Sequence, residues 1–375
     1  MEQWKEYKIE DICEQIFAGG DAAKYNSSKH QTALYNIPIY ANSTEKEGLY
    51  GYCDKAIVLS PAVTIAARGA GIGFVAFRNK PFVPIVRLIT LITNNSVDTK
   101  FLYYYLKNRR LSGDGSAIPQ ITVPMVKKEV VTIPALEEQK RIADILSSLD
   151  AKIELNRRIN DNLEQQAQLL FDNLINASDW STTQFLSELS EINPPRKLSK
   201  GEYAPFVEMS NMPTSGSFPS RIDYKEYNGG MKFRNGDTIM ARITPCLENG
   251  KAAYVNFLKE NEIGFGSTEY IVLAPKKTIS SSFLYFLVRN KEFVDYAVKH
   301  MNGSSGRQRV SGDTIGNYQL PILDRNKLSI FIAIADRTLS KIRQNSFEII
   351  NLAKQRDTLL PKLMFGELKI NDLNC

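Results

Sequence analysis

Two long stretches of the chain carry an uninterrupted helical pattern of apolar and polar positions. Residues 137–176 and residues 322–360 contain neither glycine nor proline. In both stretches apolar side chains recur at alternating spacings of four and three, the period of a coiled-coil seam. We therefore expect two long helices that pair along these seams. The predicted seam positions are Ile142, Leu146, Leu149, Ile153, Asn156, Asn160, Leu163 and Leu170 in the first helix, and Phe331, Ile342, Asn345, Ile349, Leu352 and Leu359 in the second.

The charges of the two stretches favour pairing with each other. Residues 137–164 carry five basic and seven acidic side chains, whereas residues 324–362 carry eight basic and four acidic ones. About 145 residues separate the helices, enough for the chain to return and lay the second helix antiparallel on the first. The three seam asparagines are expected to fix the register of the pair at some cost in stability. The alternative is that each helix packs only on its own domain.

The chain has the signs of a tandem duplication. Pro134 and Pro321 precede the two helical stretches and lie 187 positions apart. The segment GSAIPQITV precedes the first stretch as GSSGRQRVS precedes the second, and Trp4 with Ile9 and Ile12 parallels Trp180 with Phe185 and Leu189. We thus expect a globular domain over residues 1–134, a helix over 135–176, a second globular domain over 177–321, and a second helix with a C-terminal tail over 322–375.

Strand-like and helical runs alternate within each globular part. Runs such as KAIVLSPAVTIAA and EYIVLAP are typical of strands, and SSFLYFLVRNKEFVDYAV of a helix whose aromatic side chains pack on a sheet. The predicted fold class is α+β: two mixed α/β domains separated by two long antiparallel coiled-coil helices, with an internal pseudo-twofold repeat. About 38 helical residues would span roughly 57 Å at 1.5 Å each, a possible ruler between two DNA half-sites.

Composition narrows the functional classes. The net charge of +6 is compatible with a polyanionic partner but does not require one. Four well-separated cysteines without CxxC spacing and only two histidines argue against a zinc site, a disulfide framework and a histidine-rich metal centre. No apolar stretch approaches 18 residues and no signal peptide is visible, so we expect a cytoplasmic protein without a membrane partner.

Base recognition needs polar side chains on loops that reach the groove edges of DNA. The candidates in the second domain are Arg242, Thr244, Glu248, Asn249, Lys251, Ser267, Thr268, Glu269, Arg307, Gln308 and Arg309. The candidates in the first domain are Lys24, Tyr25, Asn42, Ser43, Arg68, Arg78, Ser116 and Gln120. The alternative for the first group is a solvated hairpin that turns at Asn249-Gly250.

Two motifs suggest catalysis without supporting it. Asn193-Pro194-Pro195-Arg196 has the first three residues of the motif by which adenine methyltransferases hold a flipped base, but Arg196 cannot supply the aromatic face. The Gly69, Gly71 and Gly73 spacing falls short of GxGxxG, and a turn is expected there. There is no P-loop motif, and no carboxylate spacing typical of a nuclease.

A family resemblance covers nearly the whole chain. The segments IPALEEQKRIADILSSLDAKIELNRRINDNLEQ and RDTLLPKLMFGEL resemble the two conserved regions of specificity (S) subunits of type I restriction-modification systems. NGDTIMARITPCLENGKAAYV and GFGSTEYIVLAP resemble one class of target recognition domain in that family.

The resemblance implies a non-catalytic subunit that reads a bipartite, asymmetric DNA sequence and docks two methyltransferase (M) subunits, with restriction (R) subunits in the full complex. It also implies that no cofactor binds this chain, and that S-adenosylmethionine, ATP and Mg belong to the partner subunits. Three alternatives stay open: an autonomous adenine methyltransferase or nuclease, a specificity subunit without a nuclease partner, and a purely structural coiled-coil adaptor.

Overall fold

The computed structural model describes residues 4–21, 25–109, 111–113, 119–304 and 306–368. The chain forms two compact units. Unit 1 comprises Met1–Lys152 and Leu352–Cys375, and unit 2 comprises Ile153–Asn351. Each unit therefore combines one globular part with portions of both long helices, a different division from the four consecutive segments expected from the sequence.

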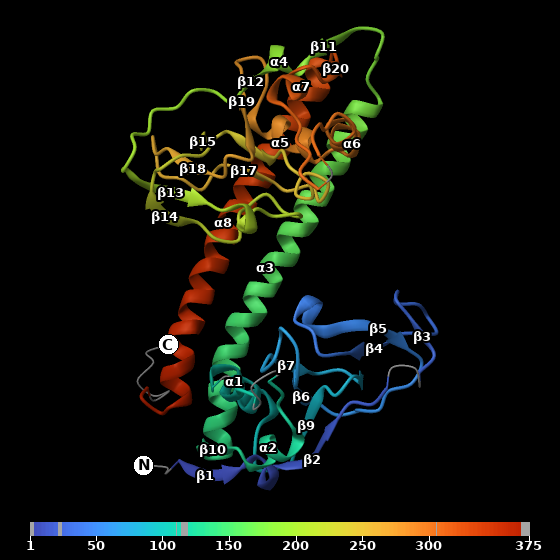
Figure 1. The fold of residues 1–375 in the computed structure, drawn as a ribbon, viewed down its shortest axis with the longest axis vertical. Coiled ribbons are helices and arrows are strands. Elements are labelled where there is room, and N and C mark those ends of the chain that lie inside the picture. Colours follow the sequence, from blue (N-terminus) through green and yellow to red (C-terminus); the bar gives the residue numbers. More distant parts are fainter. Residues whose placement is uncertain (1–3, 22–24, 110, 114–118, 305, 369–375) are drawn as a thin grey trace. The chain divides into compact units, whose positions relative to one another are not determined.

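Unit 1 contains two four-stranded sheets and one strand pair. The sheets have the strand orders β2-β9-β6-β7 and β3-β5-β4-β8, and β1 pairs with β10. The elements are β1 (Lys5–Lys8), β2 (Cys13–Ala18), β3 (Ser27–Ser28), β4 (Ile37–Tyr40), β5 (Leu49–Cys53), β6 (Ala62–Ile65), β7 (Val75–Arg78), β8 (Val83–Pro84), β9 (Ile89–Thr93), α1 (Thr99–Arg109), α2 (Val123–Lys128) and β10 (Val130–Ile133) (Figure 1).

Unit 2 is built to the same plan. Its sheets have the orders β12-β19-β16-β17 and β14-β13-β18-β15, and β11 pairs with β20. The elements are β11 (Thr183–Phe185), α4 (Leu186–Leu189), β12 (Ser190–Ile192), β13 (Tyr203–Val207), β14 (Asp223–Glu226), β15 (Lys232–Phe233), β16 (Thr238–Ala241), β17 (Ala252–Tyr254), β18 (Gly264–Gly266), β19 (Tyr270–Pro275), α5 (Ser281–Arg289), α6 (Lys291–Lys299), α7 (Gly312–Gly316) and β20 (Gln319–Pro321).

The two units repeat one another in strand pairing as well as in order. β1 and β10 pair antiparallel as β11 and β20 do. The pair β4 and β8 is parallel, and so is its counterpart β13 and β18. This agreement confirms the internal repeat. One detail of the sequence comparison was wrong: by their backbone hydrogen bonds Ile9 and Ile12 correspond to Leu186 and Leu189, and Phe185 is exposed.

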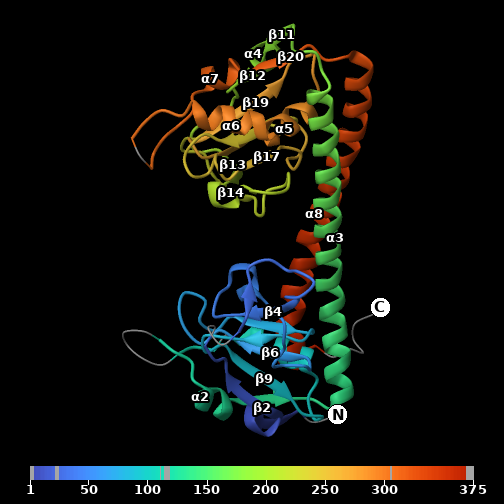
Figure 2. The same cartoon turned by 90° about the vertical axis from the view of Figure 1, so that its right-hand side faces the viewer.

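The two long helices are α3 (Leu136–Asn176) and α8 (Arg325–Met364). In unit 2 they run antiparallel, because positions later in α3 meet positions earlier in α8 (Figures 1 and 2). Asn156 Nδ2 donates to Glu348 Oε2 at 2.9 Å, and Asn345 Nδ2 donates to Asn160 Oδ1 at 2.8 Å. In unit 1 the ion pair between Arg356 of α8 and Asp150 of α3, at 2.6 Å, follows the same direction.

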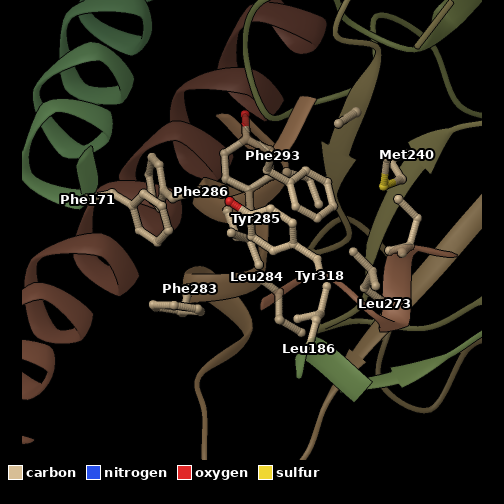
Figure 3. Close-up of a cluster of buried hydrophobic side chains, with 14 of the residues drawn as sticks. Phe171, Leu186, Met240, Leu273, Phe283, Leu284, Tyr285, Phe286, Phe293 and Tyr318 are labelled. Carbon is tan, nitrogen blue, oxygen red and sulfur yellow. The ribbon is translucent and has the colours of Figure 1, made fainter. Parts of the chain in front are cut away.

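In unit 2 both helices contribute to the core of the globular part. Phe171 of α3 and Phe331 of α8 have ring centroids 5.5 Å apart. Both rings pack in the same buried cluster as Phe283 and Phe286 of α5, part of which is drawn in Figure 3. The prediction that the α5 aromatics form core is confirmed, since Phe283 and Phe286 are fully buried.

In unit 1 the opposite ends of the helices take the same role. Ile142 and Leu146 of α3 are buried together with Leu360 and Leu363 of α8 and Phe101 of α1. The apolar stripe of each helix therefore serves two purposes, pairing with the other helix and closing the core of a globular part.

The seam departs from the heptad pattern near the C-terminal end of α3. Leu170 is 42% exposed, whereas its neighbour Phe171 is fully buried, so the predicted seam position is wrong by one residue. A helix of 3.6 residues per turn drifts from a strict 3.5-residue repeat, and over several heptads the buried face moves to the adjacent position.

Proline at position 361 does not end α8, which continues to Met364. A proline inside a helix removes one backbone hydrogen bond. Burial of Leu363 and Met364, which are 0% and 1% exposed, offsets that loss.

Three cysteines and both histidines lie in the described part of the chain. Cys13, Cys53 and Cys246 are free thiols, and His30 and His300 are exposed. Across the described ranges we find no cluster of three or more histidine, cysteine, aspartate or glutamate side chains arranged to hold a metal ion. None of the helices described is both long and apolar enough to cross a membrane.

Asn156, Asn160, Asn345 and Glu348 form a polar layer between α3 and α8. Its contribution to stability can be tested by substitution. Asn345→Ala removes the donor to Asn160 and leaves a part-buried amide oxygen without its partner, so we expect a loss of about 1–3 kcal/mol. Gln344→Ala is the matched control, because it truncates an exposed amide one residue earlier in the same helix. Urea unfolding of both variants measures the difference; equal losses would contradict a stabilising role for the layer.

Candidate nucleic-acid interface

Three loops of unit 2 meet near the ends of strands β16 and β18. Residues 242–251 connect β16 to β17, residues 267–269 connect β18 to β19, and residues 302–309 lie between α6 and α7. The amide of Arg242 donates to the carbonyl of Glu269 at 3.0 Å, which joins the first two loops. We call these three loops the unit 2 junction. All the second-domain candidates predicted from the sequence lie on these three loops.

Backbone bonds fix the third loop to the first. Thr244 N donates to Gln308 O at 3.1 Å, and Gln308 N donates to Thr244 Oγ1 at 3.0 Å. Asn302 and Arg309 exchange two backbone hydrogen bonds of 2.9 Å and so close the loop between them. Thr244 is therefore a structural residue of the junction. The glycine-serine run indicated a loop here, but no sequence signal identified Asn302 as the residue that closes it.

An ion pair lies at the centre of the junction. Arg309 Nε is 3.0 and 2.9 Å from the two carboxylate oxygens of Glu269, and Arg309 Nη2 is 2.7 Å from Oε1. The side chains remain partly accessible, at 40% for Arg309 and 25% for Glu269. The hydrogen bonds from Arg309 lower the pKa of Glu269, and its carboxylate is ionised at neutral pH.

The other candidate side chains of the junction are either exposed to solvent or hydrogen-bonded within the protein. Glu248, Asn249, Thr268 and Arg307 are exposed. Lys251 Nζ, in contrast, donates to the carbonyl of Met209 at 2.7 Å, and Ser267 Oγ accepts from the amide of Glu269 at 3.1 Å.

Arg242 adds positive charge beside Glu269 and is half-buried. Its Nε is buried and lacks a hydrogen-bond partner among the residues that the structure describes. A buried donor without a partner is costly unless an ordered water or an ion satisfies it.

Loop 242–251 is more than a two-residue hairpin. Gly250 has a φ of +66°, and the loop folds back on itself through bonds such as Lys251 N to Cys246 O at 3.0 Å. Arg289 of α5 holds its end by donating to the carbonyls of Gly250 at 2.6 Å and Ala252 at 3.0 Å. Sequence reasoning missed Arg289, because an arginine at the end of an apolar helix gives no sign of its distant partners.

Arg289 is itself supported by a buried polar network. Its Nε donates to Tyr285 Oη at 3.1 Å, and Tyr285 in turn donates to Glu164 of α3. Burial raises the pKa of Glu164, although the nearby charge of Arg289 opposes this shift. The network ties the unit 2 junction to the long helix within the same unit.

Unit 1 has a counterpart to this junction. Arg68 and Gln120 form an isolated β-bridge, and Ala67 N donates to Asn42 Oδ1 at 2.8 Å. Asn42 Nδ2 also donates to the carbonyl of Val86, so both ends of its amide are used within the domain. Arg68 is exposed and Gln120 is half-buried.

The prediction that Arg78 contacts DNA is wrong, because its side chain is buried. Its side chain is 4% exposed, its guanidinium lies 3.7 Å from the Tyr40 ring centroid, and it donates to Thr64 and to Glu47. A buried arginine with these contacts holds the two sheets of unit 1 and is not available to DNA in this structure.

The remaining first-domain candidates are less informative. Tyr25 packs against a small apolar cluster, and Ser43 Oγ accepts from the amide of Glu45 at 3.1 Å. Lys24 and Ser116 lie outside the described residues.

Gln120 and Arg309 occupy the same position in the two units. Each forms a bridge with the segment that follows the equivalent strand, Arg68 in unit 1 and Ile243 in unit 2. The next residue along, Ile121 or Val310, donates to the carbonyl of the residue just before that bridge, at 2.9 and 3.0 Å. The residue after that begins α2 or α7 as its N-cap. The two units thus share the backbone pairing at this position and differ in the side chain that it carries.

The motifs that suggested catalysis are structural. Asn193 follows β12 and exchanges hydrogen bonds with the backbone of Val272, at 2.7 and 2.9 Å. Arg196 forms a buried bidentate pair with Asp237, at 2.6 and 2.9 Å. Gly69 and Gly73, with φ of +88° and +78°, form the turn between β6 and β7, as predicted.

Comparison with known proteins adds to this geometry. The family model described as "Type I restriction modification DNA specificity domain" matches residues 1–165 and 178–327. A putative type I specificity subunit of Mycoplasma pneumoniae is 32% identical over 153 residues, covering 40% of this chain and 45% of that protein. The chain thus matches less than half the length of that relative.

Two further matches extend over most of the chain. The specificity subunit of the type I restriction enzyme MjaIX from Methanocaldococcus jannaschii is 27% identical over 361 residues, covering 86% of this chain and 81% of that protein. The crystal structure of a type I restriction-modification S subunit from M. genitalium has a TM-score of 0.64 at 18% identity and covers 96% of both chains, which shows a shared fold. With most of its length matched by the family model, the chain belongs to the family of type I restriction-modification DNA specificity domains.

Proposed function

We propose that this chain is the DNA-recognition subunit of a type I restriction-modification complex. Each unit supplies one target recognition domain, whose junction contacts one half of a bipartite, asymmetric site. The observation that carries the proposal is the repeated architecture, in which two domains with one backbone plan present loops at the same place but with different side chains. Two recognition domains of related shape with different side chains suit a DNA target whose two halves differ in sequence.

The long helices are proposed to dock two methyltransferase subunits, and restriction subunits join them in the full complex. Several apolar side chains of the helices are exposed, which supports a role in protein contacts. Those in unit 2 with the largest exposure are Leu155 (50%), Leu169 (63%), Leu170 (42%), Ile330 (62%) and Ile350 (42%). On this proposal S-adenosylmethionine, ATP and Mg are bound by the partner subunits.

An autonomous enzyme is the competing class of function. The purified chain, incubated with DNA and labelled S-adenosylmethionine, is expected to transfer no methyl group. Together with its methyltransferase partners it should produce methyladenines on opposite strands within a split motif, detected by modification mapping of cellular DNA. Methyl transfer by the chain alone would refute the proposal, and partner-dependent complexes without sequence preference would favour the adaptor alternative.

The helix length is proposed to set the gap between the half-sites. α3 is one helix whose residues belong to both units. Four residues added to α3 beside Asn156, with four added to α8 beside Glu348 to keep their pairing, lengthen each helix by about 6 Å. We expect the gap in the methylated motif to widen by roughly two base pairs. An unchanged gap, in a complex that still methylates, would contradict this idea.

Docking on the helices is testable with a charge placed on the exposed face. Leu169→Glu should weaken co-purification of the methyltransferase subunits, because a buried carboxylate opposite an apolar partner surface is unfavourable. Gln166→Glu introduces the same charge at an exposed position of the same helix turn and serves as the control. Both variants should keep the wild-type melting temperature. If they affect co-purification equally, Leu169 lies outside the contact.

A further inference from the structure

The pair formed by Arg309 and Glu269 points to a specific role within the unit 2 junction. We propose that Arg309 contacts a guanine in the half-site recognised by unit 2 and that Glu269 is the residue that positions it. This inference rests on the DNA-recognition function proposed above and assigns the base that one side chain reads.

The hydrogen bonds of Arg309 leave a defined set of donors free. Its Nε and Nη2 each direct one N–H to Glu269, and Nη1 donates one to the carbonyl of Arg307 at 3.1 Å. An arginine has five N–H donors in a rigid planar fork, so two remain without a partner among the residues that the structure describes. Guanine presents two acceptors, O6 and N7, on its major-groove edge, and two arginine donors satisfy both.

Glu269 holds the guanidinium in place before any DNA arrives. The backbone of Arg309 is also fixed, because it bridges both Ile243 and Asn302. A side chain that is already oriented loses little conformational freedom on binding. Both oxygens of Glu269 accept hydrogen bonds from Arg309, and we therefore assign this carboxylate the role of positioning the arginine.

A contact to phosphate suits Arg307 better than Arg309. The carboxylate of Glu269 beside Arg309 repels a phosphate group and cancels much of the positive charge at that position. Arg307, two residues earlier, is exposed, and no ion pair of its side chain is found within the described part of the chain. The two arginines therefore form a natural matched pair for a test.

The corresponding position in unit 1 agrees with a base-reading role. Gln120 stands where unit 2 has Arg309. A glutamine amide pairs with the N6 and N7 groups of adenine, as an arginine pairs with O6 and N7 of guanine. One backbone position would then present a different base preference in each half-site.

The test uses the complex with its methyltransferase subunits and a library of duplexes randomised across both half-sites. Binding selection on the wild-type complex should show a required guanine at one position of one half-site. Arg309→Ala should lower the preference at that position by roughly 10-fold or more, and Arg309→Lys by a smaller factor, because lysine also donates to O6 and N7 of guanine. Both variants should leave the other half-site unchanged. Glu269→Gln should lower it at the same position by a smaller factor, and Glu269→Asp should restore part of it.

Arg307→Ala is the control with a different expected result. It should weaken binding to all sequences alike and reduce the salt dependence of affinity, as loss of a phosphate contact does. If Arg309→Ala and Glu269→Gln, with unchanged melting temperatures, weaken all sequences equally or leave the preference for guanine unaltered, the assignment of Arg309 is overturned. A wild-type complex without any sequence preference would instead overturn the proposed function itself.

Discussion

The apolar stripe on each long helix is the constraint on which the rest of the structure depends. α3 and α8 each have about 40 residues and carry apolar side chains along one face. Exposure of an apolar face of that length to water is unfavourable, so it must be buried. Pairing of the two helices buries only part of that face. The globular parts cover the remainder, as shown by Phe171 and Phe331 in the core of unit 2 and by Ile142 and Leu363 in the core of unit 1. Neither the helices nor the globular parts are complete folding units without the other.

The same arrangement explains why the loops are free to vary. The sheets, helices and strand pairs of the two units share one plan, which packing against α3 and α8 holds in place. The polar side chains of the junctions lie outside these cores, although Leu247 of loop 242–251 is buried in one of them. The loop backbones are held by hydrogen bonds, such as the one from Thr244 N to Gln308 O. Side chains at positions such as 120 and 309 can therefore change without disturbing the fold, and a recognition surface needs this freedom.

The sequence predicted the parts of the structure that follow a repeating pattern along the chain, namely the two long helices and the duplicated domains. The heptad spacing located both helices and the asparagines between them, and the repeat of Pro134 at Pro321 located the duplication. The antiparallel pairing was expected from the length of the segment between the helices. The pattern failed where geometry departs from an ideal repeat, at Leu170, where the drift of a real helix moved the buried face to Phe171. For the candidate site, the sequence found the loops but not the contacts. Arg78 and Arg309 look alike in sequence; one stacks on Tyr40 in the interior and the other pairs with Glu269 near the surface.

Unit 1 is built from both ends of the chain, whereas unit 2 is a single continuous segment. Leu360, Leu363 and Met364 are buried among the same side chains as Ile9 and Phe101, and Gly366 lies beside Trp4. During synthesis on the ribosome, the N-terminal globular part emerges first but lacks these residues until the end of α8 has been translated. The core of unit 1 is thus completed after that of unit 2, and a chain that stopped before Leu360 would lack core side chains of unit 1 while keeping those of unit 2.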